Sequence, residues 1–227
     1  MKIINLVLCL AVCLLFVSSA TAQKKAVAKK FTTSGFYSDI EMTSTESGDY
    51  GGMSVYLTES DGQMFALVTI AEGVVGYPVL VEAKVTGKDM RGIEFTLPDE
   101  NGDRKYTGKV SATSLTLNYD GTRTILKRGC ANTYSNISVG SGGDYGGTEV
   151  YITDAGGTWF ALVTVAEGVL MRPILIKVDV TGKNYDKIAF TLPNENGERK
   201  LTGRITKTGL TLDEGSGRAI LKEKCYK

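Results

Sequence analysis

The chain has 227 residues, with 26 basic and 25 acidic residues, 27 glycines, four prolines and no histidine. Histidine is the commonest metal ligand and the commonest general base among side chains, so its absence argues against most transition-metal sites and hydrolytic triads. Hydrophobic residues make up 42% of the chain and charged residues 22%. This composition is globular and excludes collagen, coiled coil and extended disorder.

The first 22 residues have the pattern of a secretory signal peptide. Lys2 supplies a positive charge, residues 3–17 are almost unbroken in apolar character, and Ala20-Thr21-Ala22 provides the small-x-small pattern that signal peptidase cleaves. The apolar run is shorter than the roughly 20 residues of a membrane-spanning helix. We therefore expect cleavage before Gln23 and a secreted or periplasmic protein that has no transmembrane segment after cleavage.

Charge is unevenly distributed over the mature chain. Four lysines fall within residues 23–32, which we expect to be a flexible basic tail. Residues 31–130 include 14 acidic and 9 basic side chains, whereas residues 131–227 include 11 acidic and 12 basic side chains. Because the mature chain is neutral in total and has no basic stripe, no nucleic-acid partner is expected.

An internal repeat organises the mature chain. Segments recur 95 residues apart: 48–52 with 143–147, 65–69 with 160–164, and 95–98 with 190–193. Cys130 and Cys225 share this register, and about half of the positions between residues 48 and 130 are identical to their copies. Such a long period indicates a duplicated domain, because solenoid repeats are roughly 20 to 50 residues long. We expect two β repeat units, at 33–130 and 131–227.

Within each unit, apolar residues alternate with polar ones, which is the period of β-strands. Ile93, Phe95 and Leu97, for example, form one apolar face. Turn dipeptides such as Asp61-Gly62 and Asn101-Gly102 separate the alternating segments at short intervals. The pattern predicts strands with one solvent-exposed face at 36–42, 53–59, 64–70, 78–86, 92–97, 104–110, 114–119 and 123–128.

The expected fold is all-β, because no segment of the mature chain has a convincing helical period. Many short antiparallel strands joined by hairpins favour a meander that closes into a small barrel or a sandwich. A unit of about 95 residues is long enough to enclose its own core. The sequence therefore predicts a tandem duplication of an antiparallel meander, each unit a small barrel or sandwich, with a single fused sheet system as the alternative.

The cysteines fit an exported protein. Cys9 and Cys13 leave with the signal peptide, so the mature chain keeps Cys130 and Cys225. Two cysteines in an oxidising compartment suggest one disulfide, which would join the equivalent ends of the two units. The alternative is two separately buried thiols, because duplication alone places a cysteine at both positions.

Several residues are candidates for ligand binding: Tyr50, Glu72, Arg104, Tyr145, Trp159, Glu167 and Arg199. The two tyrosines lie in a repeated Asp-Tyr-Gly-Gly segment, whose glycines we interpret as serving a bulge or a tight approach of the backbone. Each glutamate opens a segment predicted to be irregular, 73–78 in the first unit, and such loops often carry function. The arginines could pair with these glutamates. The tryptophan is either an exposed carbohydrate platform or a ring that caps the core.

Catalysis and metal binding find little support in the sequence. The chain has no Gly-x-Ser-x-Gly elbow and no phosphate loop, and it lacks the histidine base of a nucleophilic triad. Residues 99–103 look like a calcium loop, but their glycine occupies the fourth position where such a loop needs it at the sixth. We expect no metal, no cofactor and no enzymatic activity.

These features lead to an exported, non-catalytic binding or interaction protein with two similar β lobes as the first hypothesis. A glycan or cell-envelope polymer is the expected ligand, because two similar sites would gain avidity for a repetitive polymer. A carrier of a small apolar ligand inside the barrels is the alternative, and a hydrolase that uses Glu72 and Glu167 comes third. The partner is thus an unidentified polymer, protein or small apolar ligand.

Overall fold

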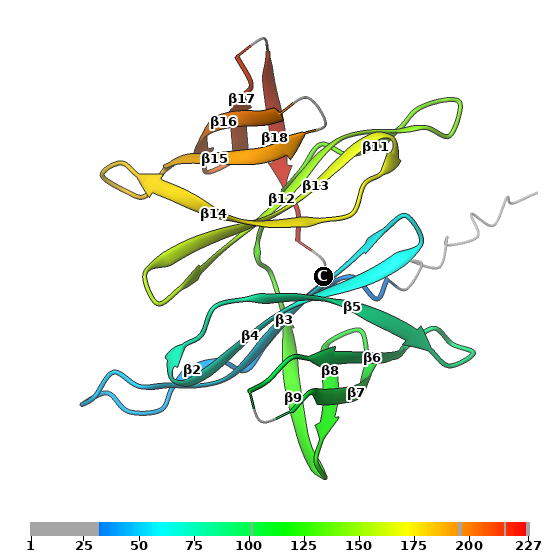
Figure 1. Cartoon of the computed structure of the whole chain (residues 1–227), viewed down its shortest axis with the longest axis vertical. Coiled ribbons are helices and arrows are strands. Elements are labelled where there is room, and N and C mark those ends of the chain that lie inside the picture. The colour runs from blue at the N-terminus through cyan, green and yellow to red at the C-terminus, as the bar shows by residue number, and fades with distance from the viewer. Residues whose placement is uncertain (1–31, 101, 195–196, 216, 226–227) are drawn as a thin grey trace, which may run out of the picture. The chain divides into compact units, whose positions relative to one another are not determined.

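The computed structural model describes residues 32–100, 102–194, 197–215 and 217–225. The predicted signal peptide, 1–22, and nearly all of the predicted basic tail, 23–32, lie outside the described residues. From Thr32 onward the chain forms one unit, and all regular secondary structure among its described residues is β-strand (Figure 1). No described residue belongs to a helix that could cross a membrane.

The first sheet is a meander closed into a barrel. Its strands are β1 (Gly35–Ser38), β2 (Glu41–Met42), β3 (Tyr50–Ser60), β4 (Gln63–Val75), β5 (Val79–Thr86), β6 (Gly92–Leu97), β7 (Arg104–Val110), β8 (Ser114–Tyr119) and β9 (Thr122–Gly129). The strand order is β1-β9-β8-β7-β6-β5-β4-β3-β2, and β1 also pairs with β3. That pairing closes the barrel and leaves β2 as an additional strand beside β3.

The second sheet repeats this topology. Its strands are β10 (Asn132–Ser135), β11 (Ser138–Val139), β12 (Tyr145–Ala155), β13 (Thr158–Leu170), β14 (Ile174–Thr181), β15 (Lys187–Asn194), β16 (Gly197–Thr206), β17 (Gly209–Asp213) and β18 (Arg218–Glu223). Here β10 pairs with both β18 and β12, which closes the second barrel. The predicted all-β tandem duplication is confirmed, and each unit is a barrel rather than a sandwich.

Most of the predicted strands agree with the structure to within a few residues. The main difference is β4, which was expected to end at residue 70 but continues to Val75. It pairs with β3 as far as Gly73, which lies opposite Tyr50. The segment 73–78 is therefore not a long irregular loop, because only residues 76–78 lie between β4 and β5.

Inward-facing side chains fill both barrels. A barrel of eight strands has an interior just wide enough for side chains. In the first barrel, Val55, Phe95 and Leu117 are at most 2% exposed. In the second barrel, Phe190 and Leu212 belong to one buried cluster that draws residues from most of its strands. Each described interior is thus a packed core.

The outer faces of β3 and β4 are also buried. Tyr56 and Leu67 point away from the interior of the first barrel, yet they form a buried cluster with Tyr151 and Leu162 of the second barrel. The outer faces of β3, β4 and β5 pack against those of β12, β13 and β14 (Figure 1). The expectation of one solvent-exposed face is wrong for these strands. Burial on both faces explains why the sequence of β4 is apolar without alternation.

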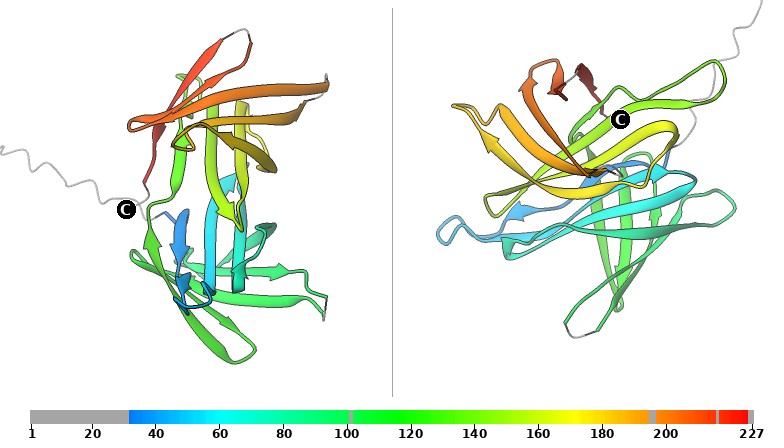
Figure 2. Two further views of the ribbon diagram at one scale, coloured as in Figure 1. Left: turned by 90° about the vertical axis from the view of Figure 1, so that its left-hand side faces the viewer. Right: turned by 45° about the horizontal axis from the view of Figure 1, so that its top comes forward.

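The β3–β4 hairpin also reaches the second barrel. Figure 2 shows the β3–β4 hairpin alongside the second barrel. The hydroxyl of Ser60, at the end of β3, donates a hydrogen bond to the carbonyl oxygen of Met171, which lies between β13 and β14. The β12–β13 hairpin of the second barrel makes a related approach to the first. A Cβ built on Gly156, in its turn, would lie 3.5 Å from the carbonyl oxygen of Val75, at the end of β4. Each hairpin thus extends to the connection that follows the equivalent hairpin of the other barrel.

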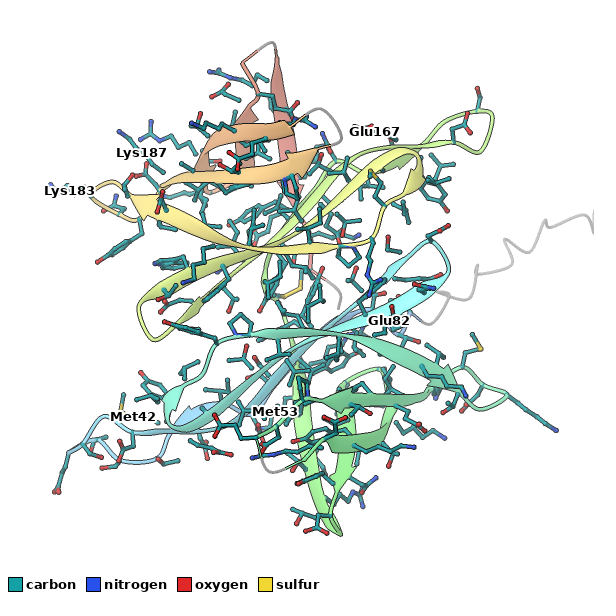
Figure 3. The ribbon with its side chains drawn as sticks, in the orientation of Figure 1. Met42, Met53, Glu82, Glu167, Lys183 and Lys187 are labelled. Carbon is teal, nitrogen blue, oxygen red and sulfur yellow. A yellow bond between two sulfur atoms is a disulfide. The ribbon has the colours of Figure 1, made fainter. Side chains whose placement is uncertain are left out.

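Different interactions hold the first and last strands of the two barrels together. In the first barrel, Arg128 of β9 donates a hydrogen bond to the carbonyl oxygen of Ser34, 2.5 Å away, just before β1. The equivalent position in the second barrel is Glu223, and there Cys130 and Cys225 form a disulfide with Cα atoms 4.9 Å apart (Figure 3). The structure therefore has a disulfide at these positions rather than two thiols. It ties the segment that leaves β18 to the segment that enters β10.

Candidate functional site

One end of the first barrel carries a cleft of about 310 Å³ lined by polar and aromatic side chains. The cleft lies where β3, β7 and β9 begin and where β4 and β8 end. These points share one end of the barrel because neighbouring strands are antiparallel. We call this cleft the first mouth and define it by Asp39, Glu72, Arg104, Tyr106 and Tyr119.

Arg104 connects the charged and aromatic parts of the first mouth. Its Nε lies 2.5 Å from Oδ2 of Asp99, and its Nη1 lies 3.5 Å from Oε1 of Glu72. Its guanidinium carbon lies 5.9 Å from the ring centroid of Tyr119, within the range of a cation–π interaction. The side chain of Glu72 is 72% exposed, so its carboxylate is accessible to a ligand.

Two tyrosine rings form one wall of the first mouth. The ring centroids of Tyr106 and Tyr119 are 5.0 Å apart, and Phe95 continues the stack at 5.2 Å from Tyr106. Burial raises the pKa of Tyr106 above its ordinary value, and the neighbouring guanidinium of Arg104 opposes that rise only in part. The hydroxyl of Tyr106 therefore stays protonated at neutral pH and can donate a hydrogen bond.

Gly52 shapes the backbone of the first mouth. Its φ is +104°, and a Cβ at this position would lie 2.7 Å from the carbonyl oxygen of Asp39. The Asp39 side chain in turn accepts a hydrogen bond from the backbone N–H of Met53 at 2.7 Å. Gly147 and Asn136 repeat both features in the second barrel. The repeated glycine thus permits a close approach of the backbone, which the sequence suggested.

The equivalent end of the second barrel has a different set of side chains. Leu201 and Glu214 stand at the positions of the two tyrosines. Arg199 forms an ion pair with Glu214, whereas the sequence suggested Glu167 as its partner. The second barrel therefore lacks the tyrosine wall, and the two mouths do not offer the same site twice.

The candidate residues from the sequence do not come together at one place. Glu72 and Arg104 meet in the first mouth, as the sequence suggested. Glu167 lies near the end of β13, at the mouth of the other barrel (Figure 3). Because the two glutamates belong to different barrels, they do not form the carboxylate pair of the hydrolase hypothesis.

The three aromatic candidates also lie apart. Tyr50 and Tyr145 begin β3 and β12, where both rings are partly exposed. Tyr50 is not among the residues that line the first mouth, and Tyr145 lines another cleft together with Glu59 and Asp61. Trp159 lies at the other end of its barrel, because it is the second residue of β13 whereas the mouth is at the end of that strand. It packs against the core of the second barrel, and Tyr185 covers it with ring centroids 6.4 Å apart. The tryptophan therefore caps the core.

Sequence reasoning missed Asp39, Tyr106 and Tyr119. Most of the candidate residues are identical in both repeats, whereas Tyr106 and Tyr119 differ from their copies. The sequence feature that could have identified these two tyrosines is a difference between the repeats at inward-facing positions near strand ends. A comparison of the two copies for unlike inward residues would have found them.

No group of three or more cysteine, aspartate or glutamate residues in the described parts of the chain could hold a metal ion. Comparison with known proteins finds no match among family models, curated proteins or solved structures. An inference about function therefore depends on the chemistry of the first mouth.

Proposed function

We propose that this protein is a non-catalytic binding protein that takes a glycan in the first mouth. The observation that supports the proposal is the convergence of Glu72, Arg104 and two tyrosine rings in one cleft. Binding sites for small ligands are concave and combine apolar or aromatic walls with a few polar groups that fix orientation. The first mouth has this composition.

The chemistry of a sugar ring matches these groups. A sugar has an apolar face of C–H groups and a rim of hydroxyl groups. The partly exposed ring of Tyr119, which stacks on the buried ring of Tyr106, offers an aromatic surface to the face. The Glu72 carboxylate and the Arg104 guanidinium offer planar acceptors and donors to adjacent hydroxyls. A cleft of about 310 Å³ lies at the lower end of the range for small-molecule sites and suits a short glycan segment.

The other hypotheses from the sequence have less support. A carrier of an apolar ligand needs a hollow barrel, and inward-facing side chains occupy the described interiors of both barrels. A hydrolase that uses Glu72 and Glu167 needs both carboxylates at one substrate, and they lie at different mouths. The proposal includes export of the protein, which would be secreted or periplasmic, to a place where envelope and extracellular glycans occur.

Replacement of Tyr119 by alanine tests the proposal. The mature protein is screened on an array of soluble oligosaccharides, and the best one is titrated by isothermal calorimetry. We expect Tyr119→Ala to weaken that binding at least about fivefold, because loss of a central aromatic contact is costly. Glu214→Ala, at the same position of the second barrel, is the matched control and should bind like wild type. Failure of every oligosaccharide to bind, or equal weakening by both substitutions, would contradict the proposal.

A further inference from the structure

The surfaces through which the two barrels pack are related by a local two-fold axis. Tyr56 stacks on its own equivalent, Tyr151, with ring centroids 4.3 Å apart and ring planes 6° apart. Leu67 and Leu162 are also equivalent residues and share the same buried cluster. In a two-fold interface, if one residue contacts a second across the interface, the equivalents of both residues make the reciprocal contact.

Contacts farther from Tyr56 and Tyr151 obey this rule. The guanidinium carbon of Arg172 lies 5.3 Å from the ring centroid of Phe65 in the first barrel. Tyr77 is the equivalent of Arg172, and its ring centroid lies 5.4 Å from that of Phe160, the equivalent of Phe65. The two contacts use the same positions with the barrels exchanged.

A second pair of contacts joins cations of the second barrel to a carboxylate and an aromatic ring of the first. Nη2 of Arg172 lies 2.7 Å from Oε1 of Glu82, which Figure 3 labels in the first barrel. Tyr77 is the equivalent of Arg172, and Lys177 is the equivalent of Glu82. Nζ of Lys177 lies 5.7 Å from the ring centroid of Tyr77. The second barrel thus brings two cations to the interface, and the first brings a carboxylate and an aromatic ring. Each cation meets a group that attracts it.

We propose that Tyr77, Glu82, Arg172 and Lys177 determine which barrels pair. The face of the first barrel fits the face of the second, and the face of the second barrel rejects another copy of itself. In a pairing of two second-barrel faces, Arg172 would meet Lys177 at two places, and like charges at an interface are destabilising. The face of the second barrel therefore selects the unlike repeat, the first barrel, as its partner. This inference is independent of the proposed glycan site.

A thiol buried in the interface can report its opening in the intact mature chain. Cys130 and Cys225 form the disulfide, so Leu162→Cys introduces a single free thiol once residues 1–22 are removed. Leu162 is 3% exposed and lies in the cluster between the barrels. Leu212→Cys is the matched control, because Leu212 is buried inside the second barrel and its reactivity reports unfolding of that barrel.

Exchange of the charged residues tests the proposal. Tyr77→Arg with Glu82→Lys gives both faces the cations of the second barrel, and we expect the Leu162→Cys thiol to react at least about fivefold faster with a thiol reagent. Further substitution with Arg172→Tyr and Lys177→Glu exchanges the two faces and restores unlike pairing. The rate should then return to within about twofold of the parent.

The Leu212→Cys rate should stay constant in all of these variants. The proposal is overturned if the first pair of substitutions causes no acceleration, or if the fourfold variant reacts as fast as the twofold variant. A parallel rise in the Leu212→Cys rate would mean that the substitutions unfold the second barrel, and this result would also overturn it.

Discussion

Alanine substitutions at Gly52 and Gly62 separate two costs of adding a side chain: the strain of a left-handed backbone and a steric collision. Gly62 has a φ of +71° and no atom within 4 Å of an added Cβ, so Gly62→Ala should cost about 1 kcal/mol of unfolding free energy for the left-handed backbone. At Gly52 the methyl group would also collide with the carbonyl oxygen of Asp39, so Gly52→Ala should cost about 3 kcal/mol. Urea unfolding of both variants measures the difference. Equal losses would show that the collision is unimportant.

The residues of the first mouth could be predicted only in part. Glu72 and Arg104 were suggested as a pair because both recur beside turns in the two repeats. Alternation within a strand tells which side chains face inward, but it does not tell which strand ends meet around an opening. Tyr119 of β8 shares the first mouth with Glu72 of β4 only because the barrel is closed. The partner of Arg199 was missed for a different reason, because Glu214, directly after the neighbouring strand β17, competes with Glu167 for the guanidinium.

At the scale of elements, the strands with one buried face were predicted most closely. Strands β6, β7 and β8 match their expected bounds because apolar and polar residues alternate along them. The end of β4 was missed because Glu72 and Gly73 interrupt its apolar run. Pairing of Gly73 with Tyr50 of β3 keeps this part of the strand in the sheet. The pairing of β1 with β9 could not be predicted, since short strands distant in sequence give no local signal.

The burial of Tyr151 where β3 packs against β12 predicts that the free energy of unfolding depends on pH. Burial raises the pKa of Tyr151 from 10.0 to about 12, and a hydrogen bond with Thr153 opposes the rise. Between these pH values the unfolded chain loses a proton that the folded chain retains, so stability falls as pH rises. We expect wild type to lose up to about 2 kcal/mol more than Tyr151→Phe between pH 10 and 12.

Urea unfolding at intervals between pH 9 and 12 measures this difference. Measurements at about pH 7 and 8 are the control, because Tyr151 keeps its proton there in both the folded and the unfolded chain, so the difference in stability between wild type and variant should be constant. Identical curves for wild type and Tyr151→Phe would show that the buried hydroxyl does not link pH to stability.

At the scale of the whole molecule, the two barrels should respond differently to reduction. Two residue pairs join β10 to β18, whereas three join β1 to β9, where Arg128 adds a hydrogen bond. Reduction of the Cys130–Cys225 disulfide should cost about 2–4 kcal/mol of stability and expose β10 and β18. Hydrogen exchange followed by mass spectrometry should show loss of protection in β10 and β18 and none in β1 and β9. Equal loss in both barrels would contradict this expectation.

Fusion of the two repeats into one chain lets each barrel vary alone. In a symmetric homodimer, one codon would specify the same mouth residue in both subunits, so a substitution would always occur twice. Here Tyr119 and Glu214 are encoded separately, although Tyr56 and Tyr151 still meet as an identical pair. The gene can therefore keep the same residues on the packing surface of both barrels while the residues of the two mouths diverge.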